Sequence, residues 1–292
     1  RKGVRVSLRR FSVVVAILLA GAVAPAAARP ASPQQVVAAF CREDALGART
    51  APRSYGRVAG LVGWPLEPAW DHVVLVQGYE VGDAQPVAPG EVEVEVTYTV
   101  TGRVSAARKD AEAHLERRRF RLALGDGGWR LVGAPPPPHL FASRVDADAL
   151  QRGLAGADGY LSQSGFVAAV LDAAGWPVAA ETVAEVLAGA TYGPVAAPRP
   201  GDVAVFVDAG QPYHVGVVEA PGRVLSATLT AGVVRSTLPA FAGEVRYLRL
   251  RAPDRSGTAD SSSASGSRSR SGAASQRRAT TDSSSAPPPP SR

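Results

Sequence analysis

The segment from Leu161 to Gly175 constrains the fold of this chain more than any other. It reads LSQSGFVAAVLDAAG, and its apolar residues recur at the spacing of one helix face. Ser162 and Ser164 stand at its start, where a hydroxyl can accept a hydrogen bond from a free backbone amide of the first turn. The pattern predicts an amphipathic helix that begins near Ser164 and ends at Gly175.

Short strands follow this helix. A further helix is predicted around Val183, a loop over 192–194, and a turn over 199–202 that leads into the block PGDVAVFV. The block HVGVV then begins a strand at His214. From residue 145 to 251 we expect an α+β domain in which a strand meander packs on a helix and leaves one cleft. The predicted strands are Val203–Val207, His214–Glu219, Arg223–Leu229, Val233–Thr237 and Val245–Leu250.

A helix followed by strands, with a histidine at a strand start, is a layout in which a nucleophile at a helix N-terminus faces a base on a sheet. The three blocks, in this order, resemble the NlpC-type family of bacterial cell-wall cysteine peptidases over about residues 150–250. The resemblance implies a papain-like α+β domain and, as ligand, peptidoglycan or muropeptide, or a partner enzyme that processes the wall.

The resemblance also identifies the positions of the chemistry. The family's nucleophile falls on Gln163, whose carboxamide has no ionisable group and cannot attack a carbonyl. The base position is kept as His214, and the third, orienting position falls on Ser226. The upstream aromatic residue that helps form the oxyanion site has only Tyr160 as a nearby candidate. We therefore expect a peptidase scaffold without its nucleophile, in which Gln163 and His214 hydrogen-bond to each other.

Two alternatives to this non-catalytic protein stay open. In the first, an active hydrolase or acyl-transfer enzyme uses Ser164 with His214, although Ser164 is turned about 100° along a helix from the family position. In the second, the chain is an interaction module whose N-terminal domain carries the specificity. For ligand contacts we consider Trp176, Tyr192 and Tyr213, which either line a peptide groove or pack in the core.

Residues 31–134 predict a separate first domain. Ser32 caps a helix from Pro33 to about Asp44, a second short helix covers 54–61, and strands follow from His72 and Glu91. The strand ERRRFRLAL then leads through GDGG into WRLVGA, a strong hairpin pattern. This order resembles the cystatin-like fold of the nuclear-transport-factor superfamily, with helices and a curved antiparallel sheet. The run from Arg117 to Arg119 predicts a solvated strand face or a site for an anionic partner.

The ends of the chain have a different composition. Residues 1–28 combine a basic start with an apolar run and a small-residue cleavage site, so we expect a signal peptide, export to the periplasm or cell wall, and no stable membrane span after cleavage; a retained anchor is the alternative. A proline-rich linker is expected over 135–144, with an exposed His139 and a helix over 147–154. From residue 252 the Ser-, Arg- and Pro-rich tail predicts disorder.

Charge and cysteine usage exclude several classes of function. The net charge is +6, but the first 28 residues contribute five positive charges and the tail a net three, which leaves −2 for the body. The basic character therefore gives no support to a nucleic-acid-binding core. Cys41 is the only cysteine, so no internal disulfide can form, and its helical pattern predicts a buried apolar role. The scattered histidines predict no metal site, and no cofactor is expected.

Overall fold

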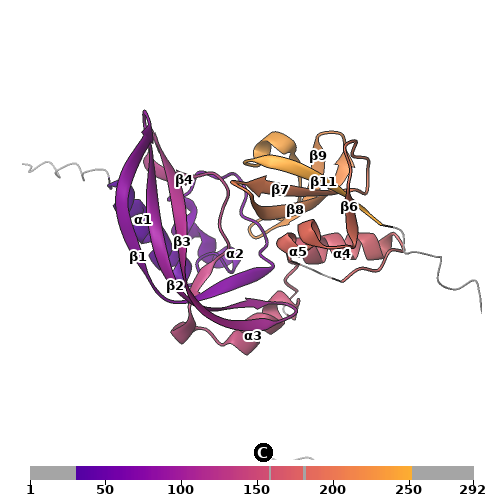
Figure 1. The fold of residues 1–292 in the computed structure, drawn as a ribbon, viewed down its shortest axis with the longest axis horizontal. Coiled ribbons are helices and arrows are strands. Elements are labelled where there is room, and N and C mark those ends of the chain that lie inside the picture. The colour runs from indigo at the N-terminus through magenta and orange to yellow at the C-terminus, as the bar shows by residue number, and fades with distance from the viewer. Residues whose placement is uncertain (1–30, 158, 180–181, 252–292) are drawn as a thin grey trace, which may run out of the picture. The chain divides into compact units, whose positions relative to one another are not determined.

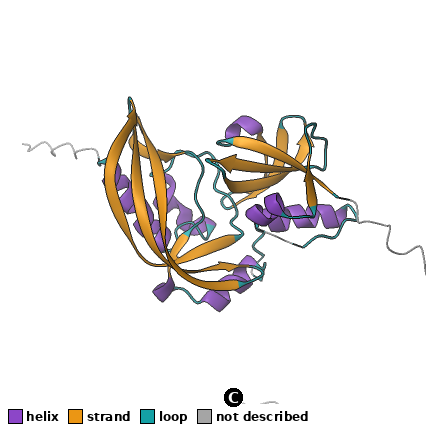
Figure 2. Ribbon diagram, in the orientation of Figure 1, coloured by secondary structure: helices purple, strands orange, loops and turns teal. Residues whose placement is uncertain are grey.

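The computed structural model describes residues 31–157, 159–179 and 182–251. The predicted signal peptide and the predicted disordered tail lie outside the described residues. Those that are described belong to one compact unit that ends at Arg251 and contains two sheets with their helices, so the predicted α+β class is confirmed (Figure 2). Figure 1 shows both sheets and the helices that pack on them.

The first sheet has the strand order β4-β3-β2-β1-β5. Its three long strands pair antiparallel and curve, as expected (Figure 1). β3 and β4 are joined by a two-residue turn between Gly125 and Gly128, which confirms the predicted hairpin. Ser32 caps the start of helix α1. Its hydroxyl accepts a hydrogen bond from the Gln35 backbone amide, and the Gln35 side-chain oxygen accepts one from the Ser32 backbone amide. The elements are α1 (Pro33–Ala45), α2 (Pro52–Ala59), β1 (His72–Ala88), β2 (Glu91–Ser105), β3 (Lys109–Gly125), β4 (Gly128–Val132) and β5 (His139–Phe141).

The predicted linker over 135–144 requires a correction. Residues 139–141 form β5, which pairs parallel with β1, so the sheet is mixed rather than purely antiparallel. The Pro138 carbonyl accepts from the Val74 amide, and the Pro136 carbonyl accepts from Arg49. The proline-rich segment is therefore packed against the first sheet, and His139 is buried rather than exposed.

The second sheet has the order β10-β9-β8-β7-β11-β6. The expected meander holds for β7 to β10, but the last strand, β11, returns to pair with β7. Residues 192–194, expected in a loop, form the edge strand β6. The elements are α3 (Ala147–Leu154), α4 (Gln163–Ala173), α5 (Val183–Ala188), β6 (Tyr192–Pro194), β7 (Val203–Asp208), β8 (Gln211–Ala220), β9 (Arg223–Thr228), β10 (Gly232–Thr237) and β11 (Glu244–Leu250), with short 3₁₀ turns at Ala142–Arg144 and Leu238–Ala240.

Each sheet has its own apolar core. The core of the first lies between α1 and the sheet, where Phe40 contacts the rings of Trp64 and Phe120. In the second, α4 and α5 pack their apolar residues on β7 and β8. The segment between α2 and β1 bonds to the second region, because the Glu67 carbonyl accepts from the Leu229 amide and the Ala69 carbonyl accepts from the Gln163 amide. Residues of the first region thus fix the start of α4.

Gly102 gives a test of the β2–β3 pairing. A Cβ at this position would lie 2.3 Å from the carbonyl oxygen of Asp110, a backbone atom that cannot move aside alone. We expect Gly102→Ala to lower the free energy of unfolding by about 1–3 kcal/mol in urea titrations, because overpacking forces the strands apart. Gly78 is the matched control, since it also lies beside a bulge and a Cβ there meets nothing within 4 Å. Equal stability of the two variants would contradict the predicted steric conflict.

Candidate functional site

The N-terminus of α4 is the structural centre of the candidate site. Ser162 is its N-cap, with a hydroxyl that accepts from the Gly165 amide, and Gln163 is the first helical residue. The Gln163 amide donates to the Ala69 carbonyl at 2.8 Å. Backbone and cap together fix the direction in which the Gln163 side chain leaves the helix, toward β8.

Gln163 and His214 meet as the sequence predicts. The Oε1 atom of Gln163 lies 2.7 Å from Nδ1 of His214 and accepts a second hydrogen bond, 3.3 Å long, from the Val215 amide. Because a backbone N–H points at this atom, it is the carboxamide oxygen, and Nδ1 of His214 is the donor. The carboxamide nitrogen of Gln163 donates in turn to the Tyr213 carbonyl at 3.3 Å. The glutamine therefore fixes one neutral tautomer of the histidine.

The surroundings of His214 are apolar. Its ring stacks on Phe241, with centroids 4.9 Å apart, and lies 5.7 Å from the ring of Phe206. The residue is 1 % exposed, and burial lowers its pKa to about 3. An imidazole that stays neutral at pH 7 can accept a proton only at Nε2, and this atom is buried and without a hydrogen-bond partner in the described part of the chain.

Ser226 lies near the histidine but does not orient it. In the β8–β9 pairing, Val217 faces Leu225, so Ser226 lies across from Gly216, two residues along β8 from His214. Two residues along a strand return to the same face. The Ser226 hydroxyl is fully buried and makes no hydrogen bond to any described residue. Ser226, the third position of the family's site, therefore lies close to His214 but makes no hydrogen bond to it.

Ser164, the predicted substitute nucleophile, is bonded to a different residue. Its hydroxyl donates to Oδ1 of Asp71 at 2.7 Å, and its backbone amide donates to the same oxygen at 2.9 Å. Burial raises the pKa of Asp71 to about 6, although the bonds from Ser164 act in the opposite direction. Ser164 and Asp71 line a cavity of about 320 Å³ together with Tyr160 and Ser162. No local pattern predicts the contact between Asp71 and Ser164, because the two residues are 93 positions apart.

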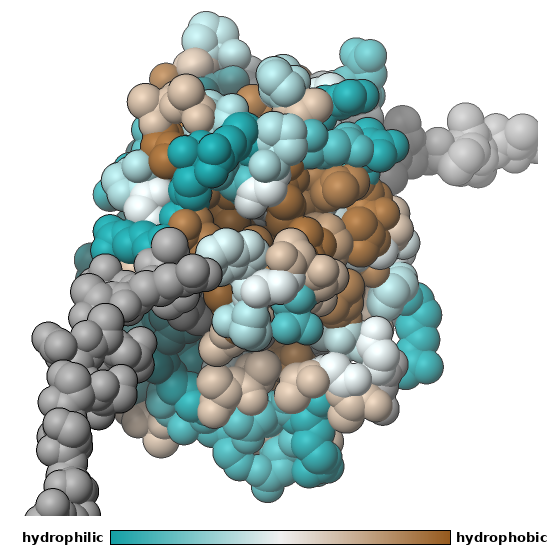
Figure 3. All heavy atoms as spheres, turned by 90° about the vertical axis from the view of Figure 1, so that its right-hand side faces the viewer, coloured by the Kyte–Doolittle hydropathy of each residue, from teal (hydrophilic) through white to brown (hydrophobic). Residues whose placement is uncertain are grey.

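The three aromatic residues considered for ligand contact do not form one groove. Tyr192 is buried in the core beside α4 and α5. Trp176 is 42 % exposed just after α4. Figure 3 shows one side of the molecule, on which hydrophobic residues gather among hydrophilic ones. Tyr213 lines a large cleft, although its hydroxyl donates to the Ala242 carbonyl. Tyr160, the weak oxyanion candidate, donates its hydroxyl to the Trp70 carbonyl.

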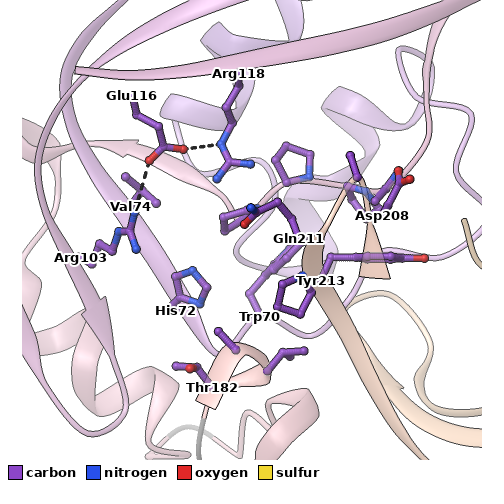
Figure 4. A pocket seen from close by; sticks show the side chains of 18 of the residues that line it. Trp70, His72, Val74, Arg103, Glu116, Arg118, Thr182, Asp208, Gln211 and Tyr213 are labelled. Atoms are coloured by element: carbon purple, nitrogen blue, oxygen red, sulfur yellow. Dashed lines mark hydrogen bonds and ion pairs between the residues drawn. The ribbon is translucent and has the colours of Figure 1, made fainter. Parts of the chain in front are cut away.

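One large cleft has a volume of about 820 Å³. Gln163 and Tyr213 line it from the second region, and the first sheet contributes ionisable residues that the sequence analysis did not single out for a site (Figure 4). These include His72 and Arg103. The run from Arg117 to Arg119 is divided between two faces, because the side chains of Arg117 and Arg119 are 73 % exposed while that of Arg118 is 27 % exposed. The expected solvated face is thus correct for two of the three arginines.

Cys41 and His139 belong to the core of the first region. The Cys41 sulfur lies 3.2 Å from the Tyr98 hydroxyl, and burial raises the pKa of the thiol to about 12, which confirms the expected buried role. His139 stacks on the Tyr98 ring at 4.0 Å, and burial lowers its pKa to about 4. The prediction that His139 is exposed is therefore wrong, because β5 places its ring against Tyr98 in the core.

Comparison with known families and curated proteins gives no relative. No family model matches the chain, and no curated protein matches it significantly. Within the described ranges, no helix has both the length and the apolar character that a membrane crossing requires. Nor do these ranges bring together three or more His, Cys, Asp or Glu side chains in an arrangement suited to a metal ion.

Proposed function

We propose that this chain is an exported, non-catalytic protein with an NlpC-type peptidase-like region that binds peptidoglycan peptides or a wall-processing partner. The observation that carries the proposal is the 2.7 Å contact between Gln163 Oε1 and His214 Nδ1, in which both residues are 1 % exposed. A nucleophile at this helix start would need that imidazole nitrogen as its base. The carboxamide occupies the nitrogen and supplies nothing that can attack.

The cleft supports a binding role. A volume of about 820 Å³ lies within the range of small-molecule and peptide sites. Its lining combines aromatic side chains with convergent polar groups, and Gln163 and Tyr213 border it beside the inactive pair. A peptide that rests there would lie against Gln163, the residue at the family's nucleophile position.

The test is incubation of the full chain with defined muropeptides, followed by mass spectrometry and calorimetry. We expect measurable binding and no cleaved product over a day at pH 7, because no ionisable nucleophile lies beside His214. Gln163→Ala is expected to leave cleavage absent and binding equal or weaker. Turnover by the wild-type chain that disappears in His214→Leu would overturn the proposal and favour an active enzyme.

A second candidate function is an interaction module whose first region carries the specificity. The charged residues that this region presents to the cleft favour it. Substitutions in the first sheet that abolish binding, beside unaffected binding by Gln163→Ala, would support this module over the peptidase-like proposal.

A further inference from the structure

The inward row of β3 changes from apolar to charged along one strand. Leu122 and Phe120 are buried in the core of the first region, and side chains two residues apart share a face. Continuing the row, the next two positions are Arg118 and Glu116. Both line the large cleft (Figure 4). Charged side chains usually lie on the solvent-facing side of a strand. Their position on the inward side here indicates a surface that contacts a polar ligand.

The charges of this row are not balanced. Arg118 Nε donates to Glu116 Oε1, and Arg103 Nη2 lies 3.5 Å from Glu116 Oε2. Neither arginine makes another ion pair among the described residues, so two guanidinium groups share one carboxylate and this cluster of three side chains has a net charge of +1. Glu116 is firmly ionised: although burial acts in the opposite direction, its contacts with His139 and Arg118 lower its pKa to about 2. The excess charge therefore persists at any physiological pH.

His72 lies beside the same two arginines and lines the same cleft. Burial, reinforced by the charges of Arg103 and Arg118, lowers its pKa to about 4. A neutral imidazole can donate one N–H to an anion without adding charge. In Figure 4 the His72 ring and the Arg118 guanidinium extend from β1 and β3, the strands on either side of β2, toward the same space.

We propose that Arg118, Arg103 and His72 form a subsite for the oxyanion group, carboxylate or phosphate, of a small ligand held in the cleft. A guanidinium fork matches both groups with two parallel hydrogen bonds, and these charge-assisted bonds strengthen out of bulk water. Trp70, Val74 and Tyr213 supply the apolar wall for the rest of the ligand. This subsite adds to the proposed function the chemical group that the cleft recognises. It rests on the proposed function only where the ligand is taken to be a peptide.

The first test needs no knowledge of the ligand. Sodium acetate and inorganic phosphate are titrated separately into the 15N-labelled full chain, at constant ionic strength, while the arginine Nε–Hε signals are followed by NMR. Saturable shifts of the Arg118 and Arg103 signals are expected with at least one anion. Response to acetate alone identifies a carboxylate subsite, response to phosphate alone a phosphate subsite. No saturable shift with either anion overturns the proposal.

Variants separate the subsite from general electrostatics. Arg118→Gln is expected to lower the affinity for the anion that causes the shifts about tenfold or more, because one charge-assisted contact is lost. Arg130→Gln is the matched control: it removes the same charge from an exposed position of the first sheet that does not line the cleft, and it is expected to change the affinity less than twofold. Unchanged backbone spectra show that both variants are folded. Equal losses in the two variants would mean nonspecific attraction and overturn the subsite.

A peptide arm distinguishes this failure from failure of the proposed function. N-acetyl-Ala-Ala with a free carboxylate and the same peptide as its C-terminal amide are titrated by calorimetry. We expect the acid to bind about tenfold or more tightly than the amide, with the difference lost in Arg118→Gln. If muropeptides bind the wild-type chain while the acid and amide do not differ, the carboxylate form of the subsite is wrong and the proposed function stands. If the anions shift Arg118 and no muropeptide binds, the proposed function is wrong and the subsite stands.

Discussion

Replacing Arg49 with methionine is expected to lower the free energy of unfolding by about 3–5 kcal/mol, the cost of leaving a buried charge without its partner. Arg49 is fully buried. Its Nε donates to Glu67 Oε1 at 2.8 Å, its Nη2 donates to the Pro136 carbonyl at 2.6 Å, and its Nη1 lies 3.6 Å from Asp44. One side chain thus joins α1, the segment before β1 and the proline-rich segment before β5.

Glu67 suffers most from this substitution. Besides Arg49, it accepts hydrogen bonds from the indole nitrogens of Trp64 and Trp70, at 2.8 and 2.7 Å. The Arg49 guanidinium lies 5.1–5.6 Å from the rings of Phe40, Trp64 and Trp70, so the cation is enclosed by aromatic faces. Methionine fills much of the volume but supplies no charge, so Glu67 loses its cationic partner inside an apolar enclosure.

Urea denaturation at pH 7 measures the effect, with Arg42→Met as control. The Arg42 side chain is 64 % exposed and, among the described residues, forms an ion pair only with Glu43, so a change within about 0.5 kcal/mol is expected. The deficit of Arg49→Met should shrink as the pH falls below 7, because burial raises the pKa of Asp44 to about 7 and this carboxyl then folds in its neutral form. A loss below about 1 kcal/mol at pH 7 would contradict the assigned role of the buried pair.

Local patterns predicted most elements of this fold. The helices α1 and α4 carry capping hydroxyls and apolar faces that a short window of sequence contains. The β3–β4 hairpin depends on adjacent glycines, and the strands β7 to β11 follow alternations bounded by turns. Gln163 and His214 were found through the order of their blocks, and their contact is present in the structure.

Long-range pairings were out of reach of the same reasoning. β5 pairs with β1 across 65 positions, so no local pattern near His139 predicts a strand. A histidine after four prolines has the composition of an exposed linker. The contact between Asp71 and Ser164 has the same origin. For Arg118 the alternation of β3 predicts two faces, but only the curved sheet decides which of them is inward.

The second large effect is the contribution of His214 to the pH dependence of stability. Burial is the sole cause that lowers the pKa of His214 to about 3, below the ordinary value of 6.5. In the unfolded chain the imidazole takes up a proton as the pH falls below 6.5, whereas in the folded chain it stays neutral until about pH 3. The stability from this group is therefore present above pH 6.5 and is lost as the pH falls toward 3.

The expected result is a loss of about 3 kcal/mol in the wild-type chain relative to His214→Leu between pH 7 and pH 4, since one proton costs about 1.4 kcal/mol per pH unit. Comparison with this variant removes the other titrating groups, among them Asp44 and Asp71, whose pKa values are raised to about 7 and 6 and which act in the opposite direction. Urea denaturation at intervals of half a pH unit supplies the two curves.

Val217→Ala is the control for His214→Leu. Val217 is buried on the same strand, two positions beyond Val215, and has no titratable group, so its cost must be equal at every pH. Imidazole nitrogen shifts followed by NMR give an independent reading, and they are expected to show His214 neutral and protonated at Nδ1 down to at least pH 4. An imidazole that titrates near pH 6.5 would mean that the contact with Gln163 opens to water, and the argument that the carboxamide blocks the base would fail with it.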